Sequence, residues 1–133
     1  MLASMRNFER GARMLQEVAA TAVIVLVFVQ LYLIAEYIFG DTGALSTHKT
    51  VGGIVPAVEV VVLIATLIGW RKDRVQVILS VLLLVVGVLQ VQFAENIGSS
   101  PSVHALHGLL AVAVVLLAAA SAHRGRTAFR PAA

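Results

Sequence analysis

Three histidines lie near the starts of two apolar segments of the chain: His48, His104 and His107. On a helix His104 and His107 lie about 60° apart, so both can face the same neighbours. Imidazole is costly inside a bilayer, and three imidazoles at one depth favour a binding site over incidental packing. Two imidazoles that face each other across an apolar bundle are typical of the axial ligands of a b-type haem.

One histidine of the close pair is expected to bind the iron, and the other to hold a haem propionate or fix its orientation. His107 is the preferred partner of His48 because it lies deeper in the apolar segment, and His104 is the alternative. Glycines a few positions from the histidines would let a flat macrocycle approach the helix backbones: Gly52, Gly53 and Gly108. Packing between membrane helices explains glycines at these positions equally well.

Four apolar segments must position these residues, at about 17–39, 51–70, 75–93 and 103–122. Each is close to the ~20 residues that cross a ~30 Å hydrocarbon core as a helix. The 133-residue chain is 59% hydrophobic and 13% charged, whereas soluble domains are about 45–50% apolar and about 25% charged. The sequence therefore predicts a single all-α domain in the lipid bilayer, an integral membrane four-helix bundle. Residues 1–16 are expected to form an amphipathic lead-in, and residues 123–133 a basic tail.

Basic residues indicate the orientation of the bundle. Every lysine and arginine except Lys49 falls on one side of the membrane if each segment crosses once. Cytoplasmic loops carry the excess of basic residues, so both termini are expected in the cytoplasm of a bacterial cell, with the chain a multi-pass protein of its membrane. The same rule accounts for the net charge of +3, and no basic, aromatic-interleaved surface is left for nucleic acid. The chain has no cysteine, which excludes covalent haem attachment and thiolate metal sites.

The remaining polar residues of the spans gather in the outer half of the predicted bundle. They include Gln30 and Glu36 near the end of the first span and Gln90 and Glu95 near the end of the third. VFVQLYLIAE followed by HKTVGG, and VGVLQVQFAE followed by HALHGL, read as one two-helix unit written twice. Such a repeat predicts a pseudo-two-fold axis along the membrane normal, which would bring the histidines of the second and fourth helices face to face. At the outer rim the two glutamates would tune a haem potential, bind a cation, or simply be solvated.

Among these polar residues, only Glu59 is expected to lie deeper than the outer layer, near the bilayer centre. It follows His48 by three helical turns on the same face, about 16 Å deeper. No lysine or arginine lies at its depth, so we expect its carboxyl group to be protonated and hydrogen-bonded across the bundle. Glu59 would then be either a proton relay or a polar staple, that is, a hydrogen-bonded contact that holds two helices together.

The motif His-Lys-x-x-Gly, formed by His48, Lys49 and Gly52, and a His-initiated fourth helix rich in Leu, Ala and Val resemble one half of the heme A synthase family. Its members are two fused four-helix bundles in tandem, with haem ligands on the second and fourth helix of each half. The resemblance implies His48 and either His104 or His107 as ligands. The family has a glutamate just before the histidine of its second helix, where this chain has Ser46 and Thr47. Only one half is present, so the resemblance implies haem binding more than the family's oxidation of a haem methyl group.

Together these features predict a membrane protein with one b-type haem near its extracytoplasmic side. It would pass electrons between that haem and a quinone or an extracytoplasmic redox partner, or handle the haem itself. Any enzymatic activity would depend on the cofactor, and a homodimer is compatible with the alanine-rich stretch 111–120. One alternative is a non-redox accessory or transport subunit whose polar layer binds a cation, a small ligand or another subunit. A second alternative is a divalent-metal site built from His48, His104, His107 and Glu95.

Overall fold

The computed structural model describes residues 2–95 and 100–127, and within them it contains four α-helices. These are α1 (Leu2–Ile38), α2 (Ala44–Gly69), α3 (Arg74–Glu95) and α4 (Pro101–Thr127). Each helix is long and apolar enough to cross a membrane. The all-α class and the four apolar helices of a multi-pass protein are thus confirmed. Of the predicted basic tail, residues 123–127 belong to α4 and residues 128–133 lie outside the described part of the chain.

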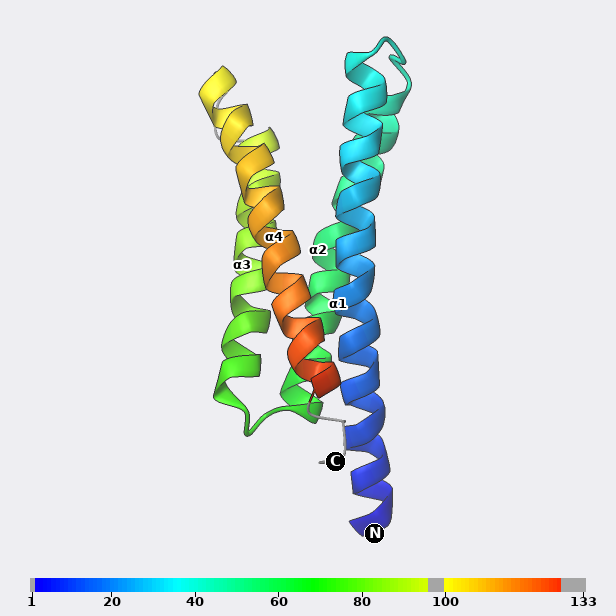
Figure 1. The fold of residues 1–133 in the computed structure, drawn as a ribbon, viewed down its shortest axis with the longest axis vertical. Helices are drawn as coiled ribbons and strands as arrows, with labels where there is room; N and C mark the ends of the chain where they lie inside the picture. The colour runs from blue at the N-terminus through cyan, green and yellow to red at the C-terminus, as the bar shows by residue number, and fades with distance from the viewer. Residues whose placement is uncertain (1, 96–99, 128–133) are drawn as a thin grey trace.

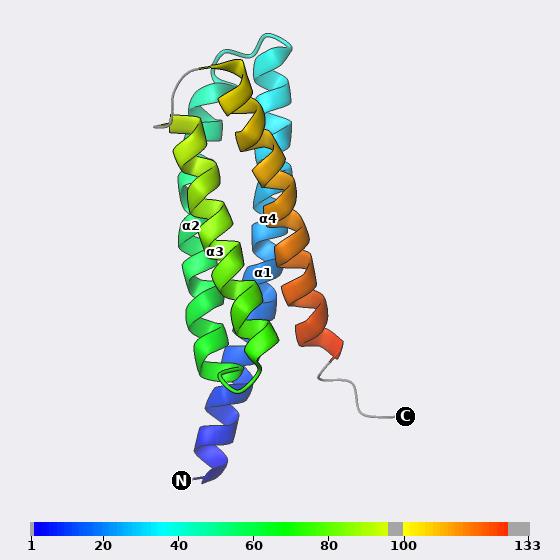
Figure 2. The same ribbon diagram turned by 90° about the vertical axis from the view of Figure 1, so that its left-hand side faces the viewer.

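The four helices form two hairpins, α1 with α2 and α3 with α4, which also contact each other through α1 with α4 and α2 with α3. Figure 1 shows that the hairpins diverge toward the end of the bundle that holds residues 39–43, which we call the open end. At the other end, the closed end, α2 turns into α3, α1 begins and α4 finishes (Figures 1 and 2). The predicted amphipathic lead-in is continuous with the first span, because α1 is a single helix from Leu2 onward.

Small residues fill the centre of the bundle, and large apolar residues face outward. The buried core is made mostly of alanine and valine, such as Ala20, Val23 and Ala118. Phe28 and Leu116, by contrast, are more than half exposed. Membrane helices associate through close packing of small residues while lipid solvates the large ones. The distribution of sizes therefore suits a bundle surrounded by lipid.

Short local contacts end the helices. Gly40 has a φ of +114°, a left-handed conformation that favours glycine, and it lets the chain reverse between α1 and α2. At the closed end the Trp70 amide donates to the Thr66 carbonyl at 2.7 Å. The Asp73 carboxylate accepts a hydrogen bond from the main-chain N–H of Gln76 at 3.2 Å, which satisfies a free donor in the first turn of α3.

A buried polar network joins the helices at the closed end. Gln16 of α1 donates from Nε2 to the Ser121 hydroxyl of α4 at 2.8 Å. Gln76 of α3 donates to the same hydroxyl at 3.0 Å, and Ser80 of α3 contacts Thr66 of α2 at 2.8 Å. All five side chains are fully buried. The prediction that only Glu59 lies deeper than the outer polar layer is therefore wrong, because these neutral side chains are buried and form hydrogen bonds with one another across the bundle.

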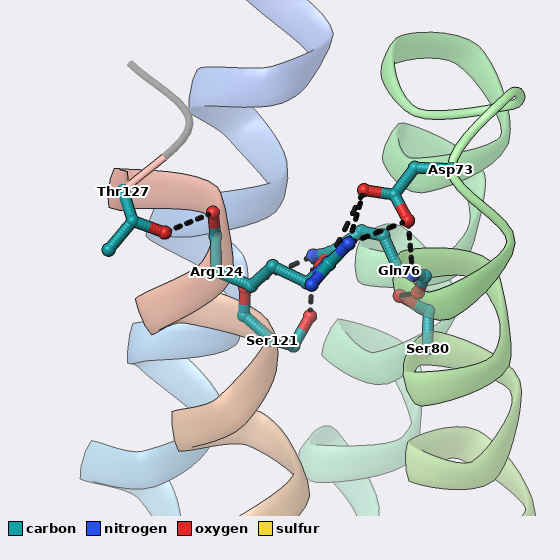
Figure 3. A network of polar contacts seen from close by, with 6 residues as sticks. All are labelled: Asp73, Gln76, Ser80, Ser121, Arg124 and Thr127. Carbon is teal, nitrogen blue, oxygen red and sulfur yellow. Dashed lines mark hydrogen bonds and ion pairs between the residues drawn. The ribbon is translucent and has the colours of Figure 1, made fainter. Parts of the chain in front are cut away.

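Ion pairs and a cation–π contact lie at the exposed edge of this network. The Arg124 guanidinium binds both oxygens of Asp73 at 3.1–3.3 Å, which joins α4 to the α2–α3 turn (Figure 3). Arg126 donates to the Glu17 carboxylate of α1 at 2.7 Å. The Arg13 guanidinium lies 4.7 Å from the centre of the Trp70 ring and donates to the Gly69 carbonyl at 2.7 Å. Polar contacts therefore connect all four helices at the closed end.

Candidate cofactor-binding cavity

A cavity of about 570 Å³ lies between the hairpins toward the open end. This volume is within the range of roughly 300–1,000 Å³ that small-molecule and cofactor sites occupy. Apolar walls come from Val27 and Ile34 of α1, Leu45 and Val55 of α2, and Val91 of α3. Polar side chains from all four helices also line it: Gln30, Tyr37, His48, Lys49, Gln90, Glu95, His104 and His107.

Two histidines from opposite hairpins face each other in this cavity. The ring centres of His48, on α2, and His107, on α4, are 6.3 Å apart, and the ring planes make an angle of 77°. Both rings are partly buried. The two imidazoles are therefore close enough to share a single small ligand or ion between them.

A main-chain carbonyl holds each of these rings. His48 Nδ1 lies 3.1 Å from the Gln30 carbonyl oxygen, and His107 Nδ1 lies 2.9 Å from that of Gln90. A carbonyl oxygen can only accept a hydrogen bond, so Nδ1 carries the proton in both rings. Nε2 of each neutral imidazole then keeps a free lone pair, as in a histidine that binds a metal and is oriented by its other nitrogen.

The two hairpins make these contacts in the same way. In the first, a glutamine of α1 supplies the carbonyl to a histidine of α2; in the second, a glutamine of α3 supplies it to a histidine of α4. The Gln30 side chain adds one contact, since its Nε2 donates to the His48 carbonyl at 2.9 Å. Gln30 is almost completely buried, so this hydrogen-bonded pair fixes α1 against α2 beside the cavity.

The paired rings fit an axially ligated iron. A metal–imidazole bond of about 2.0–2.1 Å on each side places the two ring centres roughly 6 Å apart when the metal lies between them. The observed separation is 6.3 Å. Because opposed ligands can rotate independently about their bonds to the metal, an angle of 77° between the planes is compatible with this arrangement. The donor set, the tautomers and the apolar walls are those that a bis-histidine b-type haem requires.

Most of the residues singled out from the sequence line the cavity, and three, Gly108, Glu36 and Glu59, do not. The wall includes Gln30, Gln90, His48, His104, His107, Gly52, Gly53 and Glu95. His104 is more exposed than His107. Gly108 and Glu36 are absent from the described wall, and the Glu36 carboxylate instead accepts from the Tyr32 hydroxyl at 2.6 Å along α1. Gly52 accommodates the Gln30 side chain, since a Cβ there would lie 3.5 Å from Gln30 Nε2.

Glu59 lies deep in the bundle, packed against α3. Its side chain is fully buried, and a Cβ added at Gly87 would overlap its carboxylate. Neither carboxylate oxygen has a hydrogen-bond partner within residues 2–95 and 100–127. The predicted hydrogen bond across the bundle is therefore absent from the described residues, because the wall that faces the carboxylate is a glycine. Gly87 also lines the cavity, so Glu59 lies behind the deep part of the cavity wall.

Sequence reasoning did not assign Gly87 or Lys49 to the site. Lys49 follows His48 directly and lines the cavity, and its position beside a candidate ligand was a usable signal. Gly87 precedes Gln90 by one helical turn, but nothing in the pattern of α3 indicates that it faces a carboxylate.

The histidines and carboxylates do not form a larger cluster. Across the described ranges, no group of three or more histidine, aspartate or glutamate side chains is close enough to hold a metal ion. The pair of facing imidazoles is thus the arrangement from which a function can be argued.

Comparison with known proteins found no matching family model, no matching curated protein and no matching solved structure. The function must therefore be inferred from the chain's own residues.

Proposed function

We propose that this chain is a membrane b-type haem protein, with one haem held between His48 and His107 and used for electron transfer. The observation that carries the proposal is the pair of facing imidazoles, with ring centres 6.3 Å apart and both Nδ1 atoms directed at main-chain carbonyls. A histidine held only for packing has no need of a second histidine opposite it in the same tautomer. The absence of cysteine makes the haem non-covalent, as in b-type centres.

The residues around the cavity have distinct roles in this proposal. Nε2 of His48 and of His107 would hold the iron from opposite sides, while the Gln30 and Gln90 carbonyls fix the two rings. Lys49 and His104 would bind the propionates where they line the cavity. When bound, the haem supplies one-electron chemistry. With both histidines holding the iron, the site would favour electron transfer over reactions that need an open iron position.

The distribution of charge supports an orientation. Arginines that contact other residues at the closed end include Arg13, Arg71, Arg124 and Arg126, whereas Lys49 lines the cavity. By the positive-inside rule the closed end is cytoplasmic, so both termini are cytoplasmic and the haem lies near the extracytoplasmic surface. A quinone in the bilayer or an extracytoplasmic redox protein is then the natural electron-transfer partner.

The matching Gln–His contacts of the two hairpins support the proposed two-helix repeat about an axis along the membrane normal. They also support kinship with one half of the heme A synthase family, whose members carry histidines on the second and fourth helix of each bundle. We propose that this bundle is a haem-binding relative of that half. We do not extend the proposal to oxidation of a haem methyl group, since the glutamate that precedes the family's second-helix histidine is replaced here by Ser46 and Thr47.

The visible spectrum of the detergent-purified protein tests this proposal. We expect a sharp, low-spin reduced spectrum and one haem per chain by pyridine haemochrome. His48→Ala and His107→Ala should each lose the low-spin spectrum, because each removes one axial ligand. His123→Ala is the matched control, since His123 is exposed near the far end of α4, and it should retain the full haem content.

A protein that stays colourless after haem is added would refute the proposal and favour a non-redox accessory or transport subunit. Full haem content and an unchanged spectrum in His107→Ala, together with loss of both in His104→Ala, would reassign the second ligand to His104.

A further inference from the structure

We infer that Glu59 is a redox-linked proton acceptor: it takes up a proton when the site between His48 and His107 receives an electron. The inference rests on the proposed haem site and adds a second reaction to it. In balanced form, a one-electron donor would lose one electron to the site, and one hydronium ion from the aqueous phase would give its proton to the Glu59 carboxylate, forming an O–H bond and leaving water. Oxidation releases both.

Burial and the lack of partners distinguish Glu59 from a structural carboxylate. The side chain is fully buried, and neither oxygen has a hydrogen-bond partner in the described parts of the chain. A staple between helices would need such a partner, and the facing residue, Gly87, offers no side chain. An unpartnered carboxylate in an apolar wall responds strongly to a charge that appears nearby, because little else stabilises its ionised form.

Glu59 lies beside the cavity of the proposed iron site, behind Gly87. Gly87 both contacts the Glu59 carboxylate and lines the cavity. On the helices packed around Glu59, the other titratable groups that line this cavity are Tyr37 of α1, His48 and Lys49 of α2, Glu95 of α3, and His104 and His107 of α4. Glu59 differs from Glu95 in being fully buried, whereas Glu95 is exposed.

The proton is expected to reach Glu59 from the open end. On the closed-end side, Val62 lies one turn beyond Glu59 on α2, and Leu83 lies one turn beyond Gly87 on α3. Both are fully buried. These two apolar side chains separate Glu59 from the Thr66–Ser80 contact, so the polar network of the closed end does not extend to it.

The coupling between electron and proton can be sized from helix geometry. Glu59 follows His48 by eleven residues, a separation of about 16 Å along the axis of α2. At an effective dielectric constant of about 20, a unit charge at that distance changes the proton affinity of a carboxylate about sixfold. By linkage, protonation of Glu59 makes the site about sixfold easier to reduce.

A redox titration followed by visible absorbance, repeated over a range of pH, tests the inference. In the wild-type protein the reduction equilibrium constant should be about sixfold larger at the low-pH limit than at the high-pH limit, or roughly 46 mV at 59 mV per tenfold for one electron. Glu59→Gln should keep its haem and its low-spin spectrum but lose this change. The matched control, Glu95→Gln, removes an exposed carboxylate from the same cavity and should retain it.

A Glu59→Gln protein with the wild-type pH dependence would overturn the inference, as would loss of that dependence in Glu95→Gln alone. Infrared difference spectra of the wild-type protein give a second readout that does not need the variant to fold. Reduction should produce a protonated-carboxyl band that shifts with ¹³C-glutamate labelling, which separates Glu59 from the propionates. No such band in a protein that binds haem would refute proton uptake, whereas a colourless protein would refute the haem site itself.

Discussion

The close approach of Glu59 to Gly87 predicts a specific coupling between the two positions, independent of any cofactor. A Cβ at Gly87 would overlap the Glu59 carboxylate, so Gly87→Ala must displace a fully buried side chain. Glu59→Ala removes the obstructing carboxylate. The effect of Gly87→Ala should therefore depend on which residue occupies position 59.

Two opposing contributions determine the size of the effect. Alanine is favoured over glycine in a helix by about 1 kcal/mol, and overpacking a buried site costs about 1–3 kcal/mol. With Glu59 present, Gly87→Ala should lower the free energy of unfolding by up to about 2 kcal/mol. In the Glu59→Ala background the clash is gone, and the same substitution should be neutral or stabilising. The expected coupling energy is about 1–3 kcal/mol.

Unfolding of the apoprotein by sodium dodecyl sulfate in mixed micelles can measure this double-mutant cycle. Trp70 is the single tryptophan of the chain, and its packing beneath Arg13 at the closed end makes its fluorescence a probe of the folded bundle. Gly108→Ala is the matched control, since a Cβ at Gly108 meets no atom within 4 Å. A coupling energy below about 0.5 kcal/mol, or equal effects of Gly87→Ala and Gly108→Ala, would show that the carboxylate does not occupy this position.

Two further predictions concern the closed end and the cavity. Ser121→Ala should lower the free energy of unfolding by about 1–3 kcal/mol, since the Ser121 hydroxyl accepts hydrogen bonds from both Gln16 and Gln76. The control, Thr50→Ala at an exposed position, should change the free energy of unfolding by less than about 0.5 kcal/mol. Equal effects of the two substitutions would contradict the proposed role of the buried network. Gly53→Leu should leave the apoprotein as stable as the wild type, because a Cβ there meets no protein atom within 4 Å, yet reduce haem content because Gly53 lines the cavity. Gly108→Leu should retain haem, and full haem content in Gly53→Leu would argue against a macrocycle in this space.

Composition and segment length were sufficient to predict the architecture. Four apolar runs near the length of a bilayer span can bury their backbone polar groups only as helices, and residues 2–95 and 100–127 form four such helices. α1 and α2 begin well before the expected spans and end one residue short of them, whereas α3 and α4 extend beyond the expected spans at both ends; residues 2–16 are part of α1. Helical propensity and local hydrogen bonding extend past the hydrophobic boundary, so hydropathy marks the span and not the end of the helix.

The chemistry of the cavity was only partly readable from the chain. The intervals among Gln30, His48, Gln90 and His107 predicted polar groups at one depth. The repeat also predicted that histidines of the second and fourth helices face each other. Only the packing of the hairpins gave the distance between the two rings and showed that main-chain carbonyls rather than glutamine side chains hold Nδ1. Which main-chain atom meets a side chain depends on how two helices are rotated and shifted against each other, and neighbouring residue types do not specify that.

The same limit explains the errors at Glu59 and in the closed-end network. Gln16 and Gln76 look like residues at the ends of spans, yet both are fully buried, and Glu59 faces a glycine instead of a polar partner. The helices are apolar around most of their circumference, so amphipathic periodicity does not identify their buried faces. The amino-acid types required helices in a membrane; close packing of small side chains selected the faces that meet, and with them the polar groups that became neighbours.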